Sequence, residues 1–412
     1  MSAPRGECPS LLAPMLSGDG LLVRVKPRAA TLTAHQAARV AAGAGRYGNG
    51  IVELTNRGHL QLRGFKDPGV EVFAGEMARI GLAAAAGAEA VRNVLADPLG
   101  PDDPGAAFDS HRLAHRLSAM LEGDPALHAL PRKFGLLVDA GASLPLALWR
   151  ADIMLRAAGT GIGISLDGGD RVLVVSPEAV EDAVRRLLGA FLSWMAKRDT
   201  PAPRMRAMVA ACGAAEVFGA AGLTSAPAAP CETASARPQA GFTPLAGNGF
   251  FQAGAPFGAL DATALAALAG IARRFADGNI RIAPWKAAVL CGVARERAEA
   301  LGDAAAEAGF AVGPDDPRLR IVACAGRPRC ASAHADTRAD AARLVALGAV
   351  PAGLVHLSGC AKGCAHPGPA PVALVAAEAG YGIVRGGRAG DAPALAGLTL
   401  ARAAHALSAS GP

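Results

Sequence analysis

A repeat inside the chain constrains its fold more than any other feature of the sequence. Residues 32–64 and 260–292 align without gaps at a constant offset of 228 positions. Two glycines at predicted turns of the first segment, Gly50 and Gly64, fall opposite glycines of the second. Alanine-rich helices followed by strands align loosely with one another, but such chance alignments do not place glycine at the same turns. The repeat therefore indicates a duplicated structural module.

Each copy of the module is predicted to be a small α/β unit. In the first copy, residues 20–26 alternate between two faces as a strand does, and Thr31 or Thr33 is placed to cap the helix that follows. Two short strands come next, at residues 51–54 and 60–62. The order strand, helix, strand, strand is that of a compact supersecondary unit.

Two larger α/β units are predicted to alternate with the modules. Their predicted strands are residues 134–139, 171–175, 318–323, 353–357 and 371–376, and their predicted helices are residues 178–196 and 337–347. A stretch rich in Ala, Pro, Gly and Ser, residues 213–247, is typical of a linker. The predicted domains are therefore residues 1–80, 85–212, 248–300 and 315–408, in the order small, large, small, large.

Four of the eight cysteines lie in two short glycine-containing loops of the last predicted unit. Cys324 and Cys330 form a C-x5-C pair, Cys360 and Cys364 form a C-x3-C pair, and 29 residues separate the pairs. Iron–sulfur clusters are held by cysteine thiolates, commonly four per cluster, and glycines let backbone N–H groups point at the sulfurs. Both loops follow predicted strands, at the ends where open α/β sheets bind ligands. We therefore expect one 4Fe–4S cluster on these four cysteines.

Three other interpretations of the cysteines remain open. A structural zinc ion commonly uses pairs two to four residues apart, which the five-residue gap fits poorly. Disulfides need an oxidising compartment, and nothing in the sequence indicates export. Unpaired core cysteines are common but seldom come as two tight glycine-rich pairs. The remaining cysteines show no paired spacing and are interpreted as incidental: Cys8, Cys212, Cys231 and Cys291.

The composition limits the classes of partner. The net charge of +6 comes without a block of Lys and Arg or an interleaving of aromatic and basic residues, so no nucleic-acid partner is expected. A modest positive charge fits an anionic small molecule. The chain starts without the basic and apolar regions of a signal peptide, and it lacks a run of about 18 apolar residues. We therefore expect a cytoplasmic protein with no membrane partner.

The cysteine spacing and the alternation of small and large units resemble the sulfite and nitrite reductase family. The resemblance covers nearly the whole chain apart from the predicted linker. It implies an α/β (α+β) fold in which duplicated ferredoxin-like half-modules alternate with two larger α/β domains. The first larger domain would then form a tetrapyrrole pocket, and the second would carry the 4Fe–4S cluster.

Three short basic motifs also resemble segments of this family, and the resemblance implies their roles. The stretch TNRGHLQ makes Arg57 the candidate anion clamp, because a guanidinium can fork onto a carboxylate. The stretches RNV and LPRKFG place Arg92 and Lys133 in the same anion pocket. Members of the family carry a second lysine where this chain has Gly135, which argues against reduction of a small oxyanion. The second copy of the module has Trp285 opposite Arg57.

The segment SGCAKGCAHP around the second cysteine pair resembles the corresponding segment in one branch of the family, whose members oxidise the cobalamin precursor precorrin-3A. This resemblance implies hydroxylation of C20 by O2 with formation of a γ-lactone on ring A. It also implies a mononuclear non-haem iron. Because the sequence has no dinucleotide-binding motif, we expect the electrons to come from a separate reductase or from weakly bound NADH. His334, His356 and His366 lie nearest to the cysteine loops, but the nine histidines show no spacing typical of a 2-His-1-carboxylate site.

Two alternative functions remain open. A sirohaem-dependent sulfite or nitrite reductase would use the same cysteines and hold sirohaem permanently between its domains. A non-catalytic iron–sulfur electron carrier belongs to a different class and would need no anion pocket. The basic residues Arg57, Arg92 and Lys133 therefore disfavour the carrier.

Overall fold

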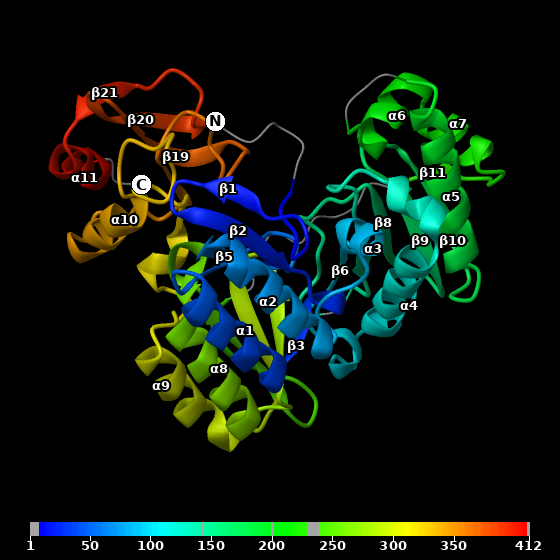
Figure 1. Ribbon diagram of the computed structural model, residues 1–412, viewed down its shortest axis with the longest axis horizontal. Helices are drawn as coiled ribbons and strands as arrows, with labels where there is room; N and C mark the ends of the chain where they lie inside the picture. The colour runs from blue at the N-terminus through cyan, green and yellow to red at the C-terminus, as the bar shows by residue number, and fades with distance from the viewer. Residues whose placement is uncertain (1–7, 142, 199–201, 229–238, 410–412) are drawn as a thin grey trace.

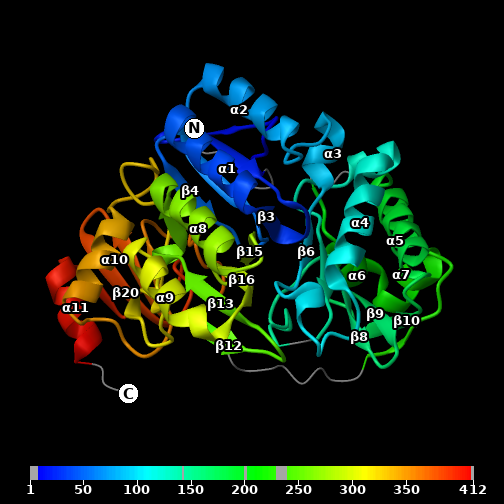
Figure 2. The same ribbon diagram turned by 90° about the horizontal axis from the view of Figure 1, so that it is seen from below.

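The computed structural model describes residues 8–141, 143–198, 202–228 and 239–409. These residues form four β-sheets. The sheets of the two module copies make a central body, and the two larger units lie on opposite sides of it (Figures 1 and 2). Within the described ranges, no helix combines the length and apolar character that crossing a bilayer requires.

The two module copies exchange a strand. The first sheet has the order β1 (Met15–Ser17), β2 (Gly20–Val25), β5 (Leu60–Phe65), β4 (Ile51–Leu54) and β14 (Ala259–Asp261). The second has the order β12 (Gly241–Pro244), β13 (Gly249–Gly254), β16 (Ala287–Val293), β15 (Asn279–Ala283) and β3 (Thr31–Thr33). The last strand of each sheet thus comes from the other copy. This exchange ties residues that are more than 200 positions apart into one body.

Helices of both copies pack on the same side of the central body (Figures 1 and 2). They are α1 (Ala34–Tyr47), α2 (Asp67–Arg79), α8 (Ala262–Phe275) and α9 (Ala298–Glu307). Thr33 caps α1 in a capping box with Gln36, and Asp261 caps α8 at the equivalent position. One shared hydrophobic core joins the two copies, with Phe65, Phe73 and Phe310 fully buried in it.

The turn glycines that indicated the duplication are equivalent in conformation. Gly50 and Gly278 have φ values of 78° and 81°, and Gly64 and Gly292 have φ values of 74° and 73°. Only glycine adopts this region freely, so its presence at both turns of both copies has a structural cause. The duplicated half-modules and the predicted fold class are therefore confirmed.

The first larger unit is a six-stranded mixed sheet with helices. Its strands lie in the order β11 (Ala226–Pro227), β10 (Arg171–Val175), β9 (Gly161–Leu166), β8 (Ile153–Ala158), β7 (Leu136–Asp139) and β6 (Val94–Ala96). Its helices are α3 (Ala86–Val91), α4 (Ser110–Gly123), α5 (Val180–Met195), α6 (Met205–Cys212) and α7 (Ala214–Ala220). Strands β6, β7 and β8 run parallel, and the others run antiparallel.

The segment 213–247, predicted as a linker, is in part folded. It contains α7, β11 and β12, and the side chains of Val217 and Phe218 are fully buried in the core of the first larger unit. The high Ala and Gly content suggested a linker, but in α7 these small residues flank Val217 and Phe218, which form the buried face of a short helix. Residues 229–238, with Cys231, lie outside the described residues.

The second larger unit carries both cysteine loops at one edge of its sheet. Its strands lie in the order β17 (Ile321–Ala323), β18 (Val355–Ser358), β19 (Ala370–Ala377), β20 (Gly380–Gly387) and β21 (Leu395–Leu398), with helices α10 (Thr337–Ala346) and α11 (Leu400–Ser408). Strands β17, β18 and β19 run parallel. Residues 318–320, the first half of the strand predicted at 318–323, instead belong to the 3-10 helix Pro317–Arg320, which Asp316 caps. Because β17 and β18 are parallel neighbours, the loops after them lie side by side.

Candidate functional site

All four cysteines of the two loops line one cavity. Cys324, Cys330, Cys360 and Cys364 border a space of about 440 Å³ between the second larger unit and the first module sheet. Residues of β2, β4 and β5 line its other side. The cysteine loops therefore face the sheet of the first module copy across the cavity.

The two cysteine loops pack directly on each other. The His334 amide donates to the Gly359 carbonyl at 2.8 Å, and the Gly359 amide donates to the Sγ atom of Cys324 at 3.2 Å. A Cβ atom on Gly359 would lie 2.7 Å from the Cβ atom of Ala333. Glycine is therefore required where the loops meet. An amide aimed at a sulfur is the contact that stabilises a thiolate bound to iron.

The sulfurs share one electrostatic environment. The pKa of the Cys364 thiol is raised, first by burial and then by negative charge on Cys360, Cys324 and Cys330. Among the described residues, no three Cys, His, Asp or Glu side chains are grouped around the position of a single metal ion. A 4Fe–4S cluster does not require such convergence, because each cysteine binds a different iron. The four cysteines with the Gly359 amide thus fit such a cluster.

The remainder of the cavity wall is strongly basic. It contains one carboxylate, Glu53, and five cationic side chains: Arg24, Arg63, Lys286, Arg338 and Lys362. Burial alone would raise the pKa of Glu53, but the charges of Arg338 and Arg63 hold it below its usual range. The Glu53 carboxylate is therefore ionised and already paired. The surplus positive charge suits an anionic ligand.

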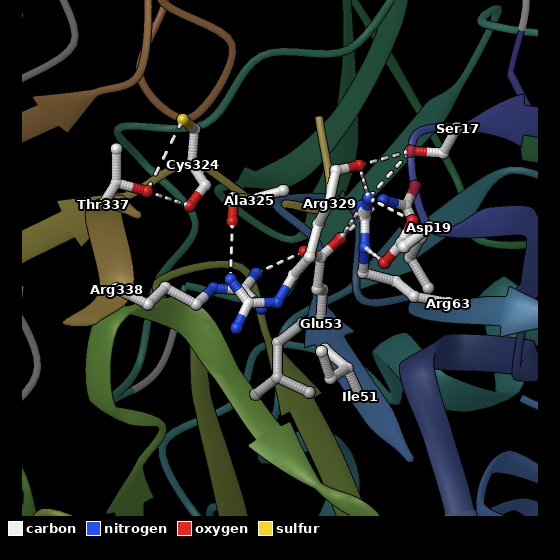
Figure 3. A network of polar contacts seen from close by, with 12 residues as sticks. Ser17, Asp19, Ile51, Glu53, Arg63, Cys324, Ala325, Arg329, Thr337 and Arg338 are labelled. Atoms are coloured by element: carbon white, nitrogen blue, oxygen red, sulfur yellow. Dashed lines mark hydrogen bonds and ion pairs between the residues drawn. The ribbon is translucent and has the colours of Figure 1, made fainter. Parts of the chain in front are cut away.

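Arg63 joins the first module to the first cysteine loop (Figure 3). Its guanidinium pairs with both oxygens of Asp19 at 2.9 Å and donates to the Ser17 hydroxyl at 2.8 Å. It also donates to the Arg329 backbone carbonyl, inside the C-x5-C loop, at 2.8 Å. Arg338 of α10 makes a second connection by pairing with Glu53. The position of the cysteine loop is thus set by charges on the half-module.

The three basic residues predicted from short motifs lie in different surroundings. Arg57 is partly buried in the turn between β4 and β5, and it has no hydrogen bond or ion pair from its guanidinium within the described part of the chain. Its pKa is lowered, chiefly by burial. Lys133 is partly exposed. Arg92 is buried, pairs with Glu89 at 2.9 Å and donates to the Leu82 carbonyl at 2.6 Å, so two of its three guanidinium nitrogens already have partners within the fold.

Sequence reasoning missed an arginine beside Gly135. The fully buried carboxylate of Asp152 accepts the backbone amides of Gly135 and Met205, each at 2.9 Å. The guanidinium of Arg204 pairs with the same carboxylate at 2.6 Å and is about one third exposed. The positive charge of Arg204 contributes to the lowered pKa of Arg57. Nothing in the local sequence signals this arginine, because it lies 69 positions after Gly135.

The histidines near the cysteine loops are not grouped with a carboxylate in the described part of the chain, as their spacing in the sequence indicated. The rings of His356 and His366 lie 5.8 Å apart, and both nitrogens of the fully buried His356 ring lack a partner in the described chain. Burial, with a smaller contribution from His366, lowers the pKa of His356 to about 4, so its ring is neutral near pH 7. The described residues do not bring a carboxylate and two histidines together at a metal position.

Residues 13–79 and 246–308 match the family model of the nitrite/sulfite reductase ferredoxin-like half domain. These two segments coincide with the two module copies. The structure is similar to that of the NirA protein of Mycobacterium tuberculosis, with a TM-score of 0.75 at 18% identity over 89% of this chain and 74% of the other. This likeness supports the same fold.

The chain is also similar in sequence to two enzymes. The chain is 35% identical over 415 residues to a precorrin-3B synthase of Sinorhizobium sp., and the alignment covers 95% of this chain and 85% of the relative. It is 24% identical over 383 residues to the chloroplastic ferredoxin–nitrite reductase of Oryza sativa subsp. japonica, covering 83% of this chain and 64% of that enzyme.

Proposed function

We propose that this chain, which belongs to the precorrin-3B synthase family within the sulfite and nitrite reductase superfamily, hydroxylates precorrin-3A at C20 with O2 and closes a γ-lactone on ring A. The observation that carries the proposal is the single cavity in which four cysteines face a basic wall. Four cysteines suit an iron–sulfur cluster, and a basic wall suits a substrate that carries many carboxylates. The family membership supplies the identity of the substrate.

The proposed reaction balances with two electrons and two protons from outside the substrate. One oxygen atom of O2 enters the tetrapyrrole and the other leaves as water. A 4Fe–4S cluster bound to Cys324, Cys330, Cys360 and Cys364 would pass electrons singly from NADH or from a separate reductase. The chain's own side chains bind and orient: the cavity cations and Arg57 hold peripheral carboxylates of the substrate.

The experiment that tests the proposal combines a visible spectrum with turnover. Anaerobically purified protein is expected to show the broad absorbance of an iron–sulfur cluster and no sirohaem bands. It is expected to oxidise precorrin-3A only when both O2 and an electron source are present, and isotopically labelled O2 should place one labelled oxygen atom in the product. A Soret band with a long-wavelength chlorin band, at one equivalent per chain, would instead indicate a sirohaem-dependent reductase.

Replacing Arg57 with alanine is expected to weaken precorrin-3A binding about 10- to 100-fold, or ~1.5–3 kcal/mol. The reason is that the Arg57 guanidinium has no partner among the described residues and can pair with a substrate carboxylate. Binding is measured by titration without O2 or electron donor, so that no substrate is consumed. The matched control is Arg79→Ala, which removes an exposed arginine at the end of α2. Equal affinities for Arg57→Ala and the unchanged protein would contradict the role of Arg57.

A further inference from the structure

Lys286 has a backbone conformation that is unusual for lysine. Its φ of 68° places it in the left-handed region, in the turn between β15 and β16, where its amide donates to the Ala283 carbonyl at 3.1 Å. The equivalent turn of the first copy places Gly58 at the same φ of 68°, with its amide donating to the Thr55 carbonyl at 3.3 Å. Residues other than glycine adopt this conformation rarely. The second copy therefore keeps a lysine where the fold favours glycine.

The surroundings of the two turns differ in a complementary way. In the first copy, a Cβ atom on Gly58 would lie 2.4 Å from the Cβ atom of Ala30. The residue equivalent to Ala30 in the second copy is Gly258, and a Cβ atom there would lie 3.4 Å from the Cγ atom of Lys286. Ala30 itself has a positive φ of 54°, so the backbone at this position does not demand glycine. In the first copy the glycine is the turn residue, Gly58, and in the second copy it is Gly258, beside which the Lys286 side chain packs.

The end of the lysine side chain reaches the cysteine-lined cavity. Its Nζ atom donates to the Leu54 carbonyl of the first copy at 2.5 Å, and no other partner is present among the described residues. An ammonium has three donors, so two remain for a ligand. The charged groups that face it are Glu53 on β4, Arg24 on β2 and Arg338 on α10.

We infer that Lys286 binds a carboxylate of the substrate within this cavity; the inference rests on the proposed function, because it takes its ligand from it. The turn imposes the left-handed backbone whatever residue stands there, and glycine, as in the first copy, would adopt it without strain. A lysine at this turn therefore indicates a use for its ammonium beyond the single hydrogen bond to the Leu54 carbonyl. Burial lowers the pKa of Lys286 to about 8. The charge of Glu53 opposes this shift, and the smaller effects of Arg24 and Arg338 add to it. A bound carboxylate adds negative charge and so restores the protonated form.

The test uses the cluster-loaded protein and titration with precorrin-3A in the absence of O2. The variant is Lys286→Gly, which copies the residue of the first module and fits the left-handed backbone, so its thermal stability should equal or exceed that of the unchanged protein. Its affinity for precorrin-3A is expected to fall about 10- to 100-fold. The matched control is Lys66→Gly, which removes an exposed lysine at the start of α2 and should leave the affinity unchanged.

The pH dependence gives a second readout. As pH rises from 7 to 9.5, Lys286 loses its proton while the substrate carboxylates stay ionised, so the affinity of the unchanged protein should fall by about tenfold. Lys286→Arg stays charged and should bind equally across this range, and Lys286→Gly should bind weakly at every pH. If precorrin-3A binds the unchanged protein and Lys286→Gly equally well, the inference fails while the proposed function stands. If the unchanged protein does not bind precorrin-3A at all, both fail.

Discussion

Replacing Cys330 with serine is expected to remove most of the iron, the sulfide and the broad visible absorbance from anaerobically prepared protein, and to abolish turnover. The four cysteines line one cavity, and a cluster commonly takes one thiolate on each iron. A serine hydroxyl is a poor substitute because it is a harder ligand that does not ionise near neutral pH. Iron and sulfide are measured chemically per chain. The same loss is expected for serine at Cys324, Cys360 or Cys364.

The matched control for this prediction is Cys212→Ser. Cys212 is exposed at the end of α6, in the first larger unit, and it does not line the cysteine cavity. This variant should keep its full iron and sulfide content. A Cys330→Ser protein with the same cluster content as Cys212→Ser would exclude Cys330 as a ligand. Zinc in place of iron in the unchanged protein would overturn the cluster itself.

The sequence predicted those parts of the fold that leave a local signal. The cap at Thr33, the turn glycines Gly50 and Gly64, and the strands before the two cysteine loops all follow from neighbouring residues. The exchange of β3 and β14 could not be predicted in this way. Each is a three-residue strand whose partners lie more than 200 positions away, so neither has a periodic pattern long enough to read.

In the candidate site, too, local patterns could be predicted and tertiary contacts could not. Cysteine spacing is a local pattern, whereas the burial of Arg92 against Glu89 and the pairing of Arg204 with Asp152 depend on tertiary packing. A motif containing an arginine does not show whether its guanidinium faces a ligand or a carboxylate of the fold. Lys286 had a usable signal, since the repeat aligns it with Gly58 at a turn, and a lysine opposite a turn glycine is unexpected.

Duplication followed by divergence explains how one body holds two different larger units. Glu53 and Arg281 occupy equivalent positions in the two copies, 228 residues apart, and carry opposite charges. Glu53 pairs with Arg338 of the second larger unit, and Arg281 pairs with Asp102 of the first. Each copy therefore uses the same strand position to bind a different neighbour. The charge reversal disfavours docking of either unit on the wrong copy.

Replacing Arg63 with leucine is expected to lower the apparent stability by about 3–5 kcal/mol and to make the protein lose its cluster faster. The Arg63 side chain is only 4% exposed, and its removal takes the shared cation from two largely covered carboxylates, those of Asp19 and Glu53. Glu53 keeps its pair with Arg338. It also removes one of the two hydrogen bonds to the Arg329 carbonyl inside the C-x5-C loop and leaves only the bond from the Ser17 hydroxyl, at 2.9 Å.

The midpoint of thermal unfolding and the rate of iron release to a chelator both report this loss. Arg63→Lys keeps the charge but not the forked geometry, so its effect should fall between those of leucine and arginine. The control, Arg39→Leu, breaks an exposed pair with Glu76 on the helical side, 3.2 Å long, which should cost at most about 1 kcal/mol. Equal iron release from Arg63→Leu and Arg39→Leu would show that the half-module does not hold the cysteine loop in place. A faster release confined to Arg63→Leu would show that the first copy of the module, besides lining the cavity, keeps the C-x5-C loop in the conformation that binds iron.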